Sequence, residues 1–69
     1  MSPQHMVHMA NQIAQFFASY PHDEAVAGVA DHIQKFWEPR MRAQLSSYIV
    51  GGGEGLHALV LDAEKALAR

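Results

Sequence analysis

Residues 10–17, Ala-Asn-Gln-Ile-Ala-Gln-Phe-Phe, and residues 30–37, Ala-Asp-His-Ile-Gln-Lys-Phe-Trp, share one pattern at an offset of 20 residues. Alanine, isoleucine and an aromatic residue recur at matching places in the two segments. At about 100° per residue, this spacing puts all three on one side of a helix. The two segments therefore predict a pair of amphipathic helices joined as a hairpin, with Phe17 and Trp37 on equivalent faces.

The first helix of this hairpin is expected over about residues 3–19. Ser2 is a suitable N-cap, Pro3 suits the first helical position, and Pro21 ends the helix because the residue before a proline avoids helical φ and ψ. Polar side chains occupy one face of the helix: His8, Asn11, Gln12, Gln15 and Ser19. The opposite arc, roughly 120° wide, is apolar and is expected to face the core: Met6, Met9, Ala10, Ile13, Phe16, Phe17 and Tyr20.

The second helix is expected over about residues 24–37, with Asp23 as its cap and Glu24 at the positive end of its dipole. Gly28, Asp31 and Lys35 fall on its polar side. Its apolar arc contains six residues: Val26, Val29, Ala30, Ile33, Phe36 and Trp37.

Two shorter helices complete the prediction. Pro39 opens a helix that extends to Val50, with Met41, Leu45 and Tyr48 on one face, and the glycines at 51–53 stop it. The last helix is expected over about residues 54–68, with an apolar stripe of Leu56, Leu59, Val60, Ala63 and Leu67. No segment alternates with a period of two, so no strand is expected. We predict an all-α fold, a small bundle of three to four short helices with a helical hairpin in the N-terminal half, as a single domain over residues 1–69.

Length and composition limit what such a domain can do. In a chain of 69 residues, apolar burial and the entropy of ordering nearly cancel, so a stabilising partner is expected. The sequence has no cysteine, which excludes disulfides and cysteine-ligated zinc or iron–sulfur sites. The net charge is −2, with only five Lys and Arg, which disfavours nucleic-acid binding. The longest apolar run has four residues, 58–61, and no signal-peptide pattern is seen, so we expect a cytoplasmic protein away from membranes.

Two motifs could carry chemistry, and each also has a structural interpretation. His5 and His8 share a helix surface and could bind zinc with a carboxylate from elsewhere, but we favour ordinary surface histidines. Residues 51–55, Gly-Gly-Gly-Glu-Gly, could cradle a phosphate. The Lys-Ser/Thr of a Walker loop is missing, so a helix cap and hinge is favoured. No arrangement of acid, base and nucleophile has a recognisable spacing, so no catalytic residue is expected.

The segment 35–42, Lys-Phe-Trp-Glu-Pro-Arg-Met-Arg, is the best candidate for a protein contact. Aromatic residues, Met and Arg are enriched at interfaces. The competing interpretation puts both aromatics in the core and leaves the arginines in solvent. Val7, Ile49, Val50 and Leu61 lie outside the apolar stripes and would enlarge an exposed patch. The predicted partner interface comprises eight residues: Phe17, Tyr20, Phe36, Trp37, Pro39, Arg40, Met41 and Arg42.

Three segments together resemble the delta subunit of NAD-dependent formate dehydrogenase: 9–17, 32–42 and 51–56. The run Phe36-Trp-Glu-Pro-Arg-Met-Arg42 is the most specific part of the resemblance. It implies an accessory subunit without catalysis of its own, which stabilises or helps assemble a cytoplasmic enzyme by docking on its large catalytic subunit. It also implies that the other subunits carry the cofactors: molybdenum or tungsten pterin, iron–sulfur clusters, FMN and NAD.

Two alternatives remain open from the residues alone. The first is a helical module that associates with itself through the same apolar surface and has no connection with formate oxidation. The second is a regulatory helix-turn-helix at the corner between the second and third helices. Its recognition helix would present only Arg40, Arg42 and Gln44 to DNA, which is weak phosphate attraction.

Overall fold

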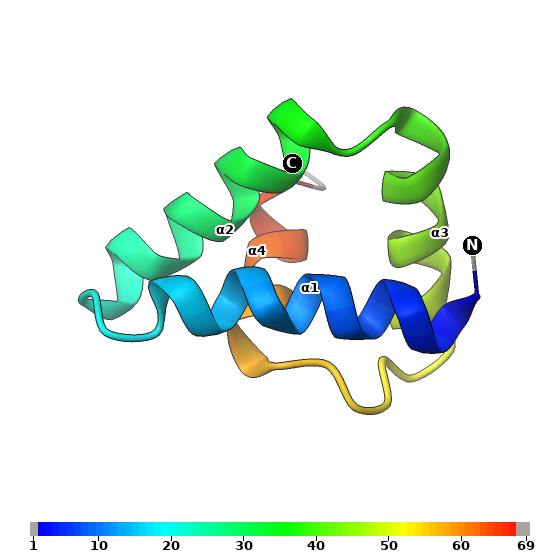
Figure 1. Cartoon of the computed structure of the whole chain (residues 1–69), viewed down its shortest axis with the longest axis horizontal. Coiled ribbons are helices and arrows are strands. Elements are labelled where there is room, and N and C mark those ends of the chain that lie inside the picture. The colour runs from blue at the N-terminus through cyan, green and yellow to red at the C-terminus, as the bar shows by residue number, and fades with distance from the viewer. Residues whose placement is uncertain (1, 68–69) are drawn as a thin grey trace.

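The computed structural model describes residues 2–67, and its helices form one small bundle (Figure 1). In chain order they are α1 (Pro3–Phe17), α2 (His22–Phe36), α3 (Pro39–Val50) and α4 (Ala58–Leu67). Within residues 2–67 no strand is present, which confirms the all-α prediction. Figure 1 shows α1 and α2 meeting at a tight turn and diverging from it, with α3 at the far end; α4 packs most extensively against α2. None of these described helices is long and apolar enough to cross a membrane.

The ends of α1 and α2 differ slightly from expectation. Ser2 caps α1 as predicted, since its Oγ accepts a hydrogen bond from the His5 N–H at 3.2 Å. The helix ends at Phe17 rather than residue 19, because the chain turns there and the Tyr20 N–H donates to the Phe17 carbonyl. Asp23 does not cap α2 as predicted. Pro21 occupies the cap position, so Asp23 lies inside the first turn and complements the helix dipole instead.

Small residues occupy much of the buried face of the hairpin. On α1 the fully buried positions are Met6, Ala10 and Ala14, and Ala25 is buried in the same way on α2. Alanines at successive turns of a helix let a neighbouring helix approach closely. Larger side chains lie on either side of these alanines. The centre of the buried face of α1 is rotated by about 60° from the centre of the predicted apolar arc. The complete core comprises Met6, Ala10, Ala14, Ala25, Val29, Ala30, Ile33, Trp37, Leu45, Leu59, Val60 and Ala63.

This rotation corrects the prediction for Phe16, which was expected to face inward, yet 68% of its surface is exposed. Tyr20 and Phe36 share the apolar arcs but were also assigned to the predicted partner interface, and they are 48% and 72% exposed. Gly28, expected on the solvent side of α2, instead lies against the ring of Phe17. The remaining apolar residues of both arcs are buried or pack against the core.

The glycine loop after α3 is a helix cap that is held in place at several points. The Gly52 N–H donates to the Ile49 carbonyl and the Gly53 N–H to the Tyr48 carbonyl, both at 3.0 Å, which is the Schellman pattern. Gly52 and Gly53 have φ of 128° and 63°, so a left-handed backbone is required at both positions. These amides are therefore engaged within the chain, which supports the capping interpretation over a phosphate cradle.

Asn11 of α1 holds the other end of the glycine loop through two hydrogen bonds. Its Nδ2 donates to the Gly55 carbonyl, and its Oδ1 accepts from the His57 N–H, each at 2.9 Å. The Tyr48 hydroxyl adds a bond to the Glu54 carbonyl at 2.6 Å. The loop is thus anchored rather than a hinge, and Asn11 is not the solvent-facing residue that was expected.

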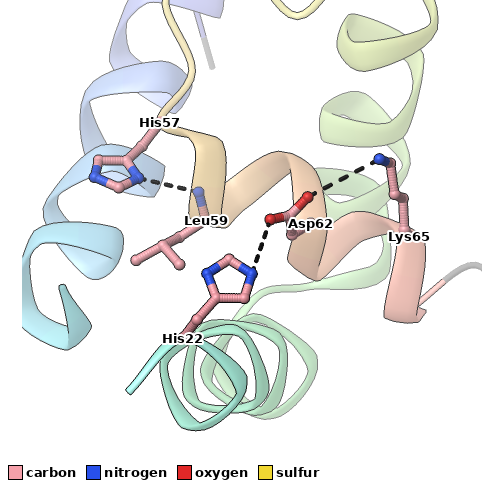
Figure 2. Close-up of polar contacts among 5 residues, drawn as sticks. All are labelled: His22, His57, Leu59, Asp62 and Lys65. Atoms are coloured by element: carbon pink, nitrogen blue, oxygen red, sulfur yellow. Dashed lines mark hydrogen bonds and ion pairs between the residues drawn. The ribbon is translucent and has the colours of Figure 1, made fainter. Parts of the chain in front are cut away.

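The start of α4 was predicted too early. The helix begins at Ala58 rather than residue 54, because residues 51–55 form the cap and turn, Gly55 has a φ of 83°, and Leu56 precedes the helix. His57 precedes the first turn, and its Nδ1 accepts a hydrogen bond from the Leu59 N–H at 3.0 Å (Figure 2). The predicted end at Ala68 lies outside the described residues.

Candidate interaction surface

The eight predicted interface residues divide by exposure. Trp37 belongs to the core, with only 6% of its surface exposed, whereas Phe36 beside it projects into solvent. The backbone explains the contrast, because Trp37 follows the last residue of α2 and has an extended conformation. Tyr20, Pro39 and Arg40 are exposed, and Phe17, Met41 and Arg42 are half-buried.

These residues also lie on separate parts of the fold. Tyr20 precedes the first turn of α2 and Phe36 ends the helix, so roughly 20 Å of helix separates them. Phe36 and Gln34 point to different sides of α2, since two residues span about 200°. Gln34 lines the corner towards α3, while Phe36 stacks on His32. The predicted interface therefore contains a corner region and an aromatic region.

The corner region surrounds a polar cavity of about 430 Å³. Pro39, Arg42 and Ser46 of α3 line it together with Glu64 of α4, whose carboxylate accepts a hydrogen bond from the Ser46 hydroxyl. The Nε of Arg42 is buried and makes no hydrogen bond with any residue between 2 and 67. Neither Arg40 nor Arg42 is in any of the ion pairs found within that range.

The aromatic region is a continuous strip across α1 and α2, which we call the aromatic strip: Ile13, Phe16, Phe17, His32 and Phe36. The first four of these residues enclose a groove of about 260 Å³. The rings of Phe16 and Phe17 meet edge to face with centroids 5.0 Å apart, and those of His32 and Phe36 lie 4.8 Å apart. Ring contacts of this kind are favourable, so they hold the walls of the groove in place.

Phe16 is the member of the strip that sequence reasoning missed as a surface residue. Phe16 was placed in the core because it shares an arc with Ile13 and Phe17. The signal for a different orientation was the pair Ala10 and Ala14, which lie one turn apart and are both fully buried.

The other apolar residues expected to enlarge an exposed patch are mostly covered. Val7 and Ile49 pack against the core, and Leu61 is half-buried beside Gly53. Val50 alone among these four is strongly exposed, at 89%, and it lies at the end of α3.

The histidines form no metal cluster in the part of the chain that the structure describes, where no group of three or more His, Asp and Glu residues is close enough to share an ion. Figure 2 shows His22 of α2 reaching Asp62 of α4, with Nε2 3.3 Å from Oδ2, while Lys65 approaches the other carboxylate oxygen at 3.9 Å. These side chains are partly to largely exposed, so the pairs contribute little to stability. Of the two pairs, His22–Asp62 joins the first turn of α2 to α4, whereas Lys65 and Asp62 both belong to α4.

The comparisons with known proteins identify the family. A family model described as the NADH-dependent formate dehydrogenase delta subunit FdsD matches residues 5–63. A search of curated proteins and a search of solved structures found no match. The matched range contains most of α1, all of α2 and α3, the glycine loop and the first half of α4. The chain therefore belongs to the family of the delta subunit of NADH-dependent formate dehydrogenase.

Proposed function

We propose that this chain is a non-catalytic subunit of a cytoplasmic formate dehydrogenase and that it docks on the large catalytic subunit. The observation that carries the proposal is the family match over residues 5–63, because that family is described as a subunit of the enzyme. Docking also suits a domain of 69 residues, since a chain of this size has little core to stabilise it alone.

The chemistry of formate oxidation is assigned to the other subunits in this proposal. They would carry molybdenum or tungsten pterin, iron–sulfur clusters and FMN, and would pass electrons to NAD. The residues of this chain do not fit those groups, because the sequence has no cysteine and residues 2–67 hold no cluster of three or more His, Asp and Glu. No step of the reaction is assigned to this chain, and its role is to stabilise the complex or to assist its assembly.

The proposed contact with the partner uses the exposed and half-exposed residues of the predicted interface. Phe36, Pro39 and Arg40 project from the end of α2 and the start of α3, and Tyr20 projects from the opposite end of the hairpin. Phe17, Met41 and Arg42 present partial surfaces. Trp37 supports the contact indirectly, because its buried side chain packs in the core next to the corner between α2 and α3.

Deletion of this chain from cells that produce the complete dehydrogenase tests the proposal. Formate oxidation, molybdenum or tungsten content and subunit assembly are then measured separately. A fragmented complex with normal metal content supports a role as scaffold, and an intact complex without metal supports a role in maturation. Normal values of all three quantities would contradict the proposal.

The corner is tested with single charge deletions in the complete chain. Arg40→Ala removes an exposed cation that has no ion pair within residues 2–67, and co-purification with the catalytic subunit is expected to fall. Lys35→Ala is the matched control, because Lys35 is also an exposed cation but is paired with Asp31 at 3.2 Å. Equal recovery of the catalytic subunit with both variants would count against a contact through Arg40.

A further inference from the structure

The groove of the aromatic strip is lined almost entirely by apolar atoms, and no other side chain between residues 2 and 67 fills it. Phe16 and Phe36 lie on different helices, 20 positions apart in sequence; Phe16 lines the groove, and Phe36 packs against His32, which also lines it. Burying both rings against a partner would remove a large apolar area from water, which is favourable. Exposed rings grouped around a recess, rather than scattered singly, are typical of a binding surface.

The lining of the groove indicates what kind of group would fit. Ile13, Phe16 and Phe17 contribute only hydrocarbon, and His32 contributes a ring whose face is covered by Phe36. No carboxylate, ammonium or guanidinium group lines the groove. Bringing a charged group there would cost desolvation without supplying a partner, so the groove selects an uncharged, apolar side chain.

The exposed area argues against a second copy of this chain as the occupant. Two phenylalanines that are each about 70% exposed present roughly 300 Å² together, whereas a stable interface needs about 800 Å² from each partner. A symmetric pair would have to obtain the remainder from the polar residues beside the strip, such as Gln12, Gln15 and the Asp31–Lys35 pair. A larger subunit can instead surround the strip and also reach the α2–α3 corner.

We infer that the aromatic strip is the centre of the contact with another subunit of the formate dehydrogenase, which inserts an uncharged apolar side chain into the groove between Phe16 and His32. This inference rests on the proposed function and deepens it, because it assigns the centre of docking to the α1–α2 face. In this arrangement Phe16 and Phe36 are the dominant contacts, and the cationic corner lies at the periphery.

The test uses the complete chain produced together with the other dehydrogenase subunits. The double variant Phe16→Gln with Phe36→Gln removes both exposed rings while leaving the buried alanine line intact. Val50→Gln is the matched control, since Val50 is even more exposed and lies away from the groove on α3. The double variant is expected to bind the partner at least about 30-fold more weakly, as for a hot spot. Its helicity and unfolding midpoint should match those of Val50→Gln.

A second measurement locates the contact directly. Benzoylphenylalanine incorporated at position 16 is expected to cross-link to another dehydrogenase subunit, within a segment of uncharged apolar residues, and the same probe at position 50 is not. Wild-type binding by the double variant, together with loss of binding by Arg40→Ala, would overturn the inference while preserving the proposed function. Failure of the wild-type chain to bind any dehydrogenase subunit would instead overturn the proposed function. A wild-type dimer that the double variant dissociates would assign the strip to a second copy and also overturn the inference.

Discussion

Gly28 of α2 lies directly against the ring of Phe17 of α1, and a Cβ added at Gly28 would stand 2.5 Å from the Cε1 of that ring. The absence of a side chain at this position therefore sets how closely the two helices of the hairpin approach. Phe17 packs partly against the core through the space that Gly28 leaves.

Gly28→Ala is expected to destabilise the chain by about 1 kcal/mol. Overpacking costs about 1–3 kcal/mol, and the gain from replacing a helical glycine offsets only about 1 kcal/mol of that. In a Phe17→Leu background the same substitution should become stabilising, because the clashing ring is gone. Urea unfolding of the two single variants and the double variant measures this change of sign. A stabilising effect of Gly28→Ala alone would show that the ring moves aside at no cost.

Asn11→Ala is expected to lower the free energy of unfolding by about 1–2 kcal/mol, because two hydrogen bonds to the loop are lost and the improved helix propensity recovers only part. Gln12→Ala is the control on the next position of α1, where the side chain is exposed, and should stay within about 0.5 kcal/mol of wild type. Equal effects of the two substitutions would contradict the role given to Asn11.

Gly53→Ala and Gly51→Ala test whether the glycine loop caps α3 through the left-handed backbone of its glycines. Gly53 has a φ of 63°, and its added Cβ would lie 3.1 Å from Leu61 Cδ2, so about 1–2 kcal/mol of stability should be lost. Gly51 has a φ of −78° and room for a methyl group, so Gly51→Ala should be nearly neutral. Thermal unfolding followed by circular dichroism compares the two, and similar midpoints would refute the left-handed requirement.

His57→Ala tests the unusual cap of α4. The loss of the bond from the Leu59 N–H to Nδ1 should cost about 1 kcal/mol, the usual cost of removing a side-chain cap. His57→Asn should restore most of that stability, because asparagine is a favoured cap and offers an acceptor oxygen. A deficit in the asparagine variant as large as that of the alanine variant would show that the imidazole acts through packing instead.

Trp37→Ala and Phe36→Ala distinguish folding from docking. Trp37 is buried, and its removal should cost about 3–5 kcal/mol, which is enough to unfold much of a marginal domain. Phe36 is largely exposed, so Phe36→Ala should leave the stability of the isolated chain within about 0.5 kcal/mol of wild type. Denaturant unfolding of the isolated chain checks both values. A large loss for Phe36→Ala would place that ring in the core.

The helices themselves could be predicted from the sequence, because prolines and glycines mark their ends and apolar residues recur at helical spacing. The boundaries of α3, the cap at Ser2 and the hairpin were all predicted. The orientation of α1 about its own axis was not predicted, because periodicity gives weight to the larger residues Ile13, Phe16 and Phe17. The fully buried face instead runs through Met6, Ala10 and Ala14. The start of α4 depended on hydrogen bonds from Asn11, which lies too far away in sequence to be read as a capping partner.

The same error explains why the candidate surface was only partly predicted. Phe36 and the residues after it were assigned to the interface because aromatic residues, Met and Arg are enriched there. Their role in docking remains a proposal. Phe16 was assigned to the core because it shares an arc with Ile13 and Phe17.

The two hydrogen bonds of Asn11 also constrain the order in which the bundle can form. They join residues that are 44 and 46 positions apart in a chain of 69. During synthesis α1 emerges first, and the side chain of Asn11 lacks both partners until residues 55–57 have left the ribosome. The contact between α1 and the glycine loop therefore forms only after residue 57 has been made, so a ribosome that stops earlier releases a product in which Asn11 lacks its partners.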